Sequence, residues 1–272
     1  MIPQNKLGEV RLVTLYEHPL SPYAQKVKIA LREKSIAFDL KMPDAIGSGQ
    51  SGGDFMVANP RGEVPALIDG DVAIFDSTII LEYIEDKWPT TPMLPAAPAA
   101  RAQARMIEEV CDTHYEAINW GLSELTYFRR AEGPLGEALR DKATDQIEML
   151  YDWLTRQLGN AQWFNGASFG WADLSVIPYV AGSSGFGIAP DDKSPLGQWF
   201  ARARARDSVA KTLAEAGNAA SAMETVSDIV KQGLFKREYR DHRLEWMIRS
   251  GGIDVVTEGL AKNNIRFSND FK

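Results

Sequence analysis

The sequence predicts a mixed α/β layer at the start of the chain, followed by an all-helical remainder. Strand-like and helix-like stretches alternate up to about residue 90, whereas strand patterns fade after residue 100. Between the two parts, Pro89, Pro92, Pro95 and Pro98 stand among small residues, a composition typical of a semi-rigid extended connector. We therefore expect a first domain at 1–88, a linker at 89–100, and a helical domain at 101–272 that includes a long C-terminal helical extension.

The α/β prediction follows from four short strand patterns and two helix patterns. The strands are expected at 10–16, 38–41, 66–68 and 72–75, and the last two are joined by an Asp69-Gly70 turn of the kind favoured in hairpins. Helices are expected at 22–34 and from a cap at Ser77 onward. The order strand, helix, strand, hairpin, helix indicates a mixed sheet covered by helices.

The remaining chain predicts helices throughout. Long helices are expected at 101–130 and 135–158. The stretch 171–179 is apolar nearly all round, as expected of a helix inside a bundle, and Pro178 should end or kink it. Residues near Ile253 keep a helical spacing, and we expect the C-terminal segment to fold back onto the body.

Composition and charge restrict the function classes. The chain has 272 residues, 44% hydrophobic and 25% charged, with a formal net charge of −7, which argues against a general nucleic-acid binder. No apolar run approaches the length that crosses a bilayer, so we expect no membrane association. The single cysteine, Cys111, and the lack of a secretion signal indicate a reducing, cytoplasmic location. Three scattered histidines show no metal-ligand spacing, so we predict no metal.

The most informative segment is 18–24, which links the first strand to the first helix. Ser21 stands in the N-cap position, and Pro22 occupies the first helical position, where its missing N–H costs nothing. A hydroxyl at the positive end of a helix can donate to a bound anion. For the Ser-Pro pair alone, an ordinary helix start is the alternative interpretation.

Two later segments, 59–67 (NPRGEVPAL) and Phe75-Asp76-Ser77, resemble the glutathione transferase superfamily when taken together with Ser21-Pro22-Tyr23. The resemblance covers roughly 11–214 and is strongest to the serine-type tau and phi classes and related bacterial enzymes. It implies a thioredoxin-like N-terminal domain with a mixed four-stranded sheet, followed by an all-helical domain. Omega-type relatives carry cysteine at the position of Ser21, so serine here argues against their reductase chemistry.

The resemblance also implies how these segments would form one glutathione site. Pro65 would be cis, and the backbone of Val64 would then pair with the cysteinyl unit as an added strand does. Ser77 would bind the γ-glutamyl carboxylate at a helix N-terminus, and Asp76 would meet the ammonium group. Ser21 would donate to the sulfur and stabilise the thiolate, and would not itself be a nucleophile.

Further residues are assigned from the same resemblance. Glu63 stands where many relatives carry lysine or glutamine near the glycyl carboxylate, and Lys41 and Arg61 are candidates for a compensating cation. Tyr23, His114 and Tyr115 are assigned to the second-substrate pocket, with core packing as the default for Tyr115. Gly170 and Asp173 resemble the family's buried capping box, which we interpret as folding-related.

The predicted function is therefore a glutathione transferase that activates the glutathione thiolate for attack on a small apolar electrophile. Glutathione is the expected co-substrate, and a homodimer is the expected assembly. One alternative is a specialised glutathione-dependent ether-cleaving enzyme or dehalogenase. A second alternative is a non-catalytic glutathione-fold protein that binds ligands or acts as a scaffold.

Overall fold

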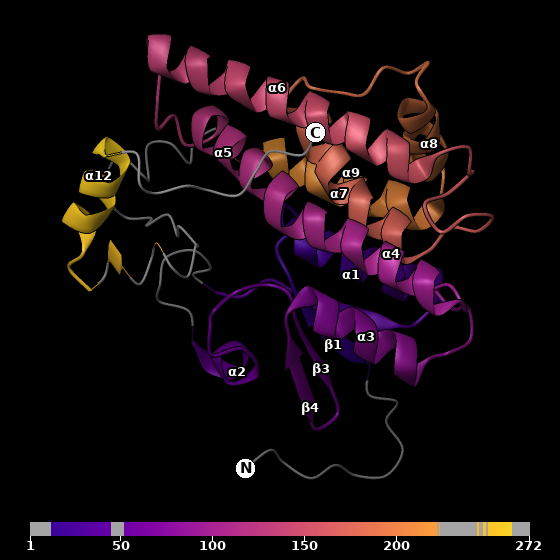
Figure 1. Cartoon of the computed structure of the whole chain (residues 1–272). Coiled ribbons are helices and arrows are strands. Elements are labelled where there is room, and N and C mark those ends of the chain that lie inside the picture. Colours follow the sequence, from indigo (N-terminus) through magenta and orange to yellow (C-terminus); the bar gives the residue numbers. More distant parts are fainter. Residues whose placement is uncertain are drawn as a thin grey trace.

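The computed structural model describes residues 12–44, 52–221 and 250–262, together with 223, 244, 247 and 248. Figure 1 shows a small α/β layer with a larger set of helices packed above it. The described elements of the α/β layer, in chain order, are β1 (Val13–Tyr16), α1 (Pro22–Glu33), β2 (Phe38–Lys41), α2 (Gly53–Ala58), β3 (Ala66–Asp69), β4 (Val72–Phe75) and α3 (Ser77–Lys87). Those that follow are α4 (Pro98–Val110), the π-helix η1 (Cys111–Tyr115), α5 (Glu116–Thr126), α6 (Gly133–Leu158), α7 (Trp171–Gly185), α8 (Pro195–Arg204), α9 (Asp207–Ser221) and α12 (Ile253–Ala261).

The four strands form one mixed sheet in the order β2-β1-β3-β4. β1 is parallel to β2, whereas the β1–β3 and β3–β4 pairs are antiparallel. The last residue of β1, Tyr16, pairs with Lys41 on one side and Ala66 on the other, and Ala66 pairs with Phe75. The ends of β1, β2 and β4 and the start of β3 therefore share one edge. The mixed sheet and helical remainder confirm the predicted fold class.

Helix α1 lies between the sheet and the helical part of the molecule. Its residues from Ala24 to Leu31 are all buried, because α1 packs against α3 on one side and against α7 and α9 on another. Both lysines in this stretch, Lys26 and Lys28, are completely buried. Helices usually keep their charged side chains in solvent. Because burial of an unpaired charge is costly, these two lysines require partners from neighbouring elements.

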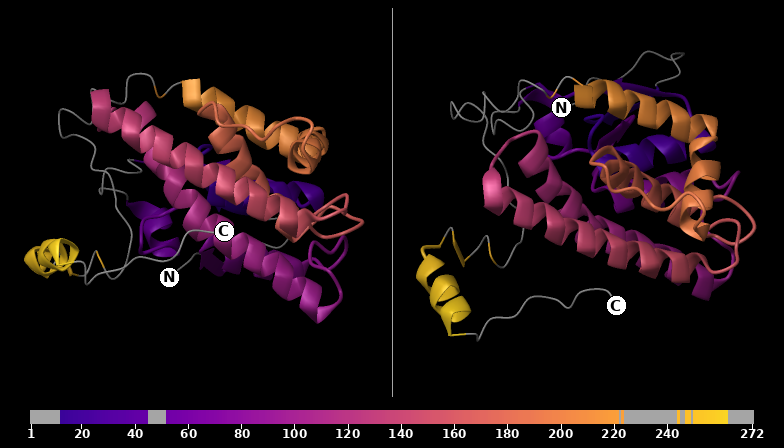
Figure 2. Two further views of the ribbon diagram at one scale, coloured as in Figure 1. Left: turned by 45° about the horizontal axis from the view of Figure 1, so that its top comes forward. Right: turned by 90° about the horizontal axis from the view of Figure 1, so that it is seen from above.

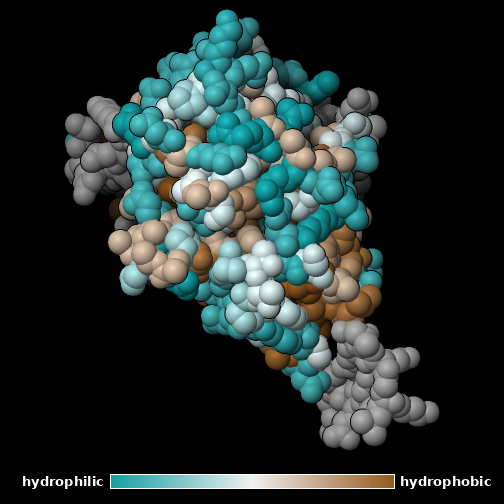
Figure 3. All heavy atoms as spheres, turned by 90° about the vertical axis from the view of Figure 1, so that its right-hand side faces the viewer, coloured by the Kyte–Doolittle hydropathy of each residue, from teal (hydrophilic) through white to brown (hydrophobic). Residues whose placement is uncertain are grey.

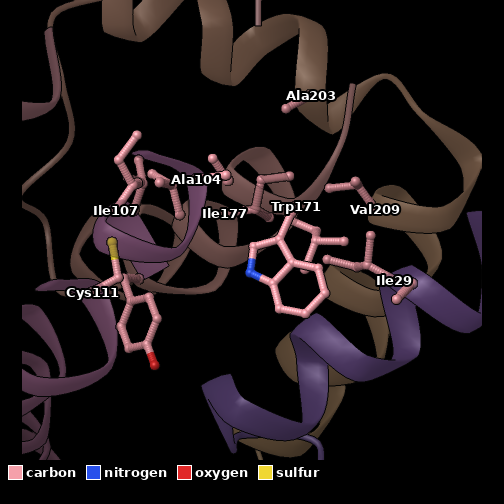
Figure 4. Close-up of a cluster of buried hydrophobic side chains, with 14 of the residues drawn as sticks. Ile29, Ala104, Ile107, Cys111, Trp171, Ile177, Ala203 and Val209 are labelled. Atoms are coloured by element: carbon pink, nitrogen blue, oxygen red, sulfur yellow. The ribbon is translucent and has the colours of Figure 1, made fainter. Parts of the chain in front are cut away.

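One continuous hydrophobic core joins the two parts of the chain. Figure 4 shows Ile29 of α1 and Val209 of α9 in one cluster with Trp171 and Ile177 of α7 and Ile107 of α4. Trp171 is only 1% exposed. On the face seen in Figure 3 most residues are hydrophilic, and the largest hydrophobic area lies low on the right, with smaller spots elsewhere. The helical part is thus packed onto the α/β layer through apolar side chains.

Several predicted boundaries are confirmed, and others need correction. β2 and β4 have the predicted bounds, and the hairpin turns at Gly70, whose φ is +63°. Helix α3 is capped by Asp76 and not by Ser77, which is its first helical residue. Helix α2 was not predicted, since its six residues are too few to show a helical period.

The helix predicted over 101–130 is three elements in the structure. α4 begins at Pro98, inside the expected linker, and passes through the π-helix η1 into α5, which ends at Thr126. A single π turn inserts one residue and shifts the apolar pattern only locally, and so short a shift is not recognisable in one sequence. Of the two effects expected of Pro178, an end or a kink, the end is wrong, because α7 continues past it to Gly185. The packing that buries α7 outweighs the one hydrogen bond that the proline removes.

The C-terminal helix forms where the sequence predicts it, but it does not pack where we expected. α12 forms at the place expected for a last short helix, yet Figures 1 and 2 show it apart from the main body, so the expected packing is not made by this helix. The predictions for 1–11 and 45–51, and those for most of 222–249, lie outside the described residues. None of the helices in the described part of the chain is long and apolar enough to cross a membrane.

Candidate functional site

Three segments singled out in the sequence meet at one edge of the sheet. Ser21 follows the end of β1 by five residues, Val64 and Pro65 immediately precede β3, and Asp76 and Ser77 immediately follow β4. Tyr16, Ala66 and Phe75 are successive partners across the sheet at this edge. Neighbouring strands lie about 4.8 Å apart, so these three paired residues, next to which the segments begin or end, span roughly 10 Å.

The loop that carries Ser21 is held by four backbone and side-chain hydrogen bonds. The N–H groups of Leu20 and Ser21 donate to Nδ1 and the carbonyl of His18 at 3.2 and 2.8 Å. Gln25 Nε2 donates to the carbonyl of Pro19 at 2.8 Å, and the N–H of Glu17 donates to the carbonyl of Lys41 at 2.9 Å. Burial, helped by the charge of Lys28, lowers the pKa of His18, which favours the neutral imidazole that accepts from Leu20.

Ser21 is the N-cap of α1, as predicted, and Pro22 is the first helical residue. Its Oγ accepts a hydrogen bond from the N–H of Ala24 at 3.3 Å. Among the described residues, no acceptor is found for the hydroxyl proton of Ser21. The side chain is half-buried, so the hydroxyl can donate to a molecule bound at the sheet edge.

The Val64–Pro65 peptide bond is cis. The loop before it is fixed by Asn59, whose amide Nδ2 donates to the carbonyl of Glu63 at 2.6 Å and whose Oδ1 accepts from the N–H of Arg61 at 2.9 Å. Gly62 in this loop has a φ of +68°, a conformation that favours glycine. The cis bond therefore presents Val64 at the sheet edge, next to the start of β3.

Asp76 and Ser77 form the start of α3. Asp76 has a φ of +75°, which is uncommon for a residue other than glycine, and its Oδ1 accepts from the N–H groups of Thr78 and Ile79 at 3.0 and 3.2 Å. The Asp76 side chain is exposed, whereas Ser77 is only 4% exposed. The start of α3 therefore lies at the sheet edge where β1 ends, with Asp76 exposed and Ser77 buried.

The charged residues around this edge are partly paired. Arg61 Nη2 lies 2.7 Å from Glu63 Oε2, so Arg61 neutralises the carboxylate that the sequence places near an expected anion. Lys41 stands at the same edge, with its Nζ 5.9 Å from the centre of the Tyr16 ring.

The three residues assigned to a second-substrate pocket differ in burial and in their hydrogen-bond partners. The hydroxyl of Tyr23 donates to the carbonyl of Asp112 at 2.8 Å, and His114, half-buried in η1, lies near Thr113. Tyr115, by contrast, is completely buried, with its hydroxyl 2.7 Å from Ser183 Oγ. Its assignment to the pocket is therefore wrong. The side chain packs in the core, which was the alternative considered for it.

Sequence reasoning missed a buried ionic cluster behind the site. Lys26 Nζ lies 2.5 Å from Glu108 Oε1 and 2.5 Å from Asp112 Oδ2. Burial opposes the charged form of Lys26, but the two carboxylates outweigh burial and raise its pKa. The available signal was weak: Glu108 and Asp112 stand four residues apart, on one face of a helix, as surface pairs also do.

The capping box of α7 is confirmed as a buried structural unit. The N–H of Gly170 donates to Asp173 Oδ2 at 3.0 Å, and the carboxylate also accepts from the N–H of Phe164 at 2.9 Å and from Trp199 Nε1 at 2.7 Å. A Cβ at Gly170 would lie 1.8 Å from Asn165 Nδ2 and 2.3 Å from the carbonyl oxygen of Met93. Glycine therefore replaces the usual serine or threonine cap because no side chain fits there.

The described residues include no group of three or more His, Cys, Asp or Glu side chains that could hold a metal ion. The absence of a metal from the whole protein stays a prediction.

The chain is similar in sequence and in fold to known glutathione transferases. The family model described as glutathione S-transferase, N-terminal domain, matches residues 15–92. Glutathione S-transferase 1 of Dianthus caryophyllus is 31% identical over 184 residues, which cover 66% of this chain and 82% of that protein. The structure of rice GST1 in complex with glutathione is similar with a TM-score of 0.67 and 23% identity, covering 81% of this chain and 98% of that one.

A further relative limits what the comparisons establish. The stringent starvation protein A homolog of Coxiella burnetii is 35% identical over 96 residues, which cover 35% of this chain and only 44% of that protein. Its name does not describe a transferase. Similarity to these relatives therefore identifies the family and the fold. The reaction has to be inferred from the residues of the site.

Proposed function

The chain belongs to the glutathione S-transferase family, and we propose that it is a transferase that activates the glutathione thiol for attack on a small apolar electrophile. The observation that carries this proposal is the meeting of Ser21, the cis Val64–Pro65 bond and the start of α3 at one sheet edge. Each segment offers a different kind of contact: a hydroxyl, an open backbone edge and a helix N-terminus.

Ser21 has the chemistry that thiol activation requires. A free thiol with a pKa near ~8.5 is mostly protonated at neutral pH, and only the thiolate is a good nucleophile. The Ser21 hydroxyl can donate to the sulfur while its oxygen caps α1, and the N-terminus of α1 favours a negative charge nearby. Both effects lower the thiol pKa. The hydroxyl acts as a donor throughout and forms no covalent bond.

The other two segments would hold the tripeptide. The backbone of Val64, exposed by the cis bond to Pro65, suits the cysteinyl unit. The N-terminus of α3 at Ser77 suits the γ-glutamyl carboxylate, and the exposed carboxylate of Asp76 suits the ammonium group. At the glycyl end, the Arg61–Glu63 pair offers Arg61 to the carboxylate if Glu63 turns away.

The second substrate would enter beside Tyr23 and His114. Both are half-buried; Tyr23 of the first turn of α1 is bonded to Asp112 of η1, and His114 belongs to the same π-helix. A specialised ether-cleaving enzyme or a dehalogenase would use the same thiolate, and these reactions are separated from simple conjugation by assays with aryl ethers and haloalkanes. A homodimer and a cytoplasmic location remain predictions, and size-exclusion chromatography with light scattering tests the first.

The test is Ser21→Ala, compared with Ser194→Ala as a matched control. Ser194 also caps a helix and also precedes a proline, but it lies in the helical part of the chain. We expect Ser21→Ala to lower the turnover of chlorodinitrobenzene by about 10²–10³-fold while glutathione affinity is retained, because one donor to the developing charge is lost. Ser194→Ala should leave turnover unchanged.

The contrary results are equally specific. Wild-type turnover in the Ser21→Ala variant would remove Ser21 from the reaction. Failure of the wild-type protein to be retained on glutathione agarose would favour the non-catalytic binding or scaffold protein.

A further inference from the structure

A single buried carboxylate contacts both helices that begin at the site. Glu108 of α4 is only 2% exposed. Its Oε1 lies 2.5 Å from Lys26 Nζ of α1 and accepts from Thr78 Oγ1 of α3 at 2.9 Å. Its other oxygen accepts the indole N–H of Trp171 in α7. Both carboxylate oxygens of Glu108 therefore have hydrogen-bond partners within the protein.

The two contacts fall close to the residues that would bind glutathione. Thr78 directly follows Ser77, and its backbone N–H is one of the two that Asp76 caps. Lys26 is five residues after Ser21, in the second turn of α1. The starts of α1 and α3 are therefore linked through one oxygen atom of a third helix.

We propose that Glu108 is a positioning residue that fixes the start of α3 relative to the start of α1 by binding Lys26 and Thr78 at once. This inference rests on the proposed function, since it assigns to Glu108 the spacing between the thiol-activating hydroxyl and the γ-glutamyl end of the site. Glu108 is not assigned any contact with glutathione or with the electrophile.

The Lys26 side of the link is held firmly. Lys26 is completely buried, and its second partner, Asp112, also accepts from the hydroxyl of Tyr179 at 2.8 Å. The carbonyl of Asp112 accepts from the hydroxyl of Tyr23, two residues after Ser21. α1 is therefore tied to α4 and η1 at two points. Buried charged groups that are fully hydrogen-bonded make the surrounding structure rigid, so α1 is held in place here.

The Thr78 side of the link is a single hydrogen bond. The Oγ1 of Thr78 is the only side-chain atom of α3 that we find bound to Glu108 among the described residues. Because the same tripeptide would contact both helix starts, an error of about 1 Å in their spacing would weaken its binding. Loss of this hydrogen bond should therefore act on the γ-glutamyl end first.

The test is Thr78→Val, which keeps the shape of the side chain and removes the hydroxyl. We expect the KM and Kd for glutathione to rise about tenfold, the equivalent of one hydrogen bond to a charged group, while kcat at saturating glutathione stays within about twofold. Thr78→Ser, which keeps the hydroxyl, should restore both constants. Thr144→Val is the matched control, because Thr144 Oγ1 bonds only within α6.

A double-mutant cycle identifies Glu108 as the partner. In the Glu108→Gln background, Thr78→Val should add less than about twofold to Kd if the two residues act together. Hydrogen exchange on the ligand-free protein should be faster at the N–H groups of Thr78 and Ile79 in Thr78→Val than in wild type, and the increase should exceed any increase seen in Thr144→Val. This readout does not depend on Glu108→Gln folding.

The outcomes separate the two proposals. A wild-type protein that does not bind glutathione would overturn the proposed function. A wild-type protein that binds glutathione, together with a Thr78→Val variant of unchanged Kd and unchanged exchange, would overturn the positioning role alone. An equal loss in Thr78→Ser and Thr78→Val would also overturn it, because the hydroxyl would then not matter.

Discussion

Ser21 and Ser194 begin helices in the same way, yet their surroundings differ. Each is an N-cap followed by proline, and each oxygen accepts from the N–H three residues later, at 3.3 Å for Ser21 and 3.0 Å for Ser194. The hydroxyl of Ser194 also donates to the carbonyl of Asp191 at 2.6 Å, so its proton is used within its own loop. The proton of Ser21 has no such acceptor among the described residues. Identical capping chemistry thus leaves a donor available in one place and not in the other.

A third helix start, that of α7, shows the opposite extreme. There the cap has no side chain, and the carboxylate of Asp173 receives donors from four residues in the protein interior. Nothing is left available for a ligand. The comparison teaches that a helix N-terminus becomes a binding site only when its own chain leaves donors unused.

The largest effect on stability is expected at α7. Asp173→Ala would leave the N–H groups of Gly170 and Phe164 and the indole of Trp199 without their acceptor in the core. We expect a loss of about 3–4 kcal/mol in the free energy of unfolding, because each unsatisfied buried donor costs roughly 1–3 kcal/mol. Urea denaturation measures it. A loss below about 1 kcal/mol would contradict a structural role for this helix start.

The same carboxyl should make stability depend on pH. Burial raises the pKa of Asp173 from 3.8 to about 6, despite the opposing hydrogen bonds from Trp199 and the backbone. The native state therefore binds more protons than the unfolded state between about pH 4 and pH 6, so this group's contribution falls as pH rises through that window, by about 3 kcal/mol in total. Denaturation of wild type and Asp173→Asn at several pH values measures the difference. Parallel profiles would contradict it.

Gly170→Ala tests whether the glycine cap is a matter of space. The added Cβ would meet the backbone carbonyl of Met93 at 2.3 Å, and we expect a loss of about 2 kcal/mol, typical of overpacking a rigid site. Gly185→Ala is the control at the other end of α7, where a Cβ meets nothing within 4 Å. Thermal denaturation measures the stability of both variants. Equal stability would show that the protein accommodates a Cβ at Gly170, and that space does not explain the glycine.

The smallest effects sharpen the comparison of the two serines. Ser21→Ala and Ser194→Ala should each cost about 1 kcal/mol of folding free energy, since each removes one N-cap. Their equal stability loss, set against the unequal turnover expected above, would separate capping from activation. A much larger loss of folding free energy in Ser21→Ala would mean that its lower turnover reflects partial unfolding and not loss of the donor.

Much of the fold was predictable because it depends on short-range patterns. The bounds of β2 and β4, the Asp69-Gly70 turn and the Gly170–Asp173 box all follow from a few neighbouring residues. The π-helix η1 was not predictable, since its five residues show no pattern of their own, and the hydrogen bond between Tyr115 and Ser183 joins residues 68 positions apart. The ionic partners of Lys26 lie more than 80 residues away in the chain.

The sequence alone determined the local chemistry of the candidate site: a serine at a helix start, a proline after Val64, and a polar pair where α3 begins. Local rules decide these features, because a cap or a turn requires only its nearest residues. Only the tertiary structure decided that the three segments share a sheet edge, and that one buried carboxylate of α4 contacts both helices that start there. Strand pairing and burial of charge depend on residues distant in sequence, and no local pattern encodes their spacing.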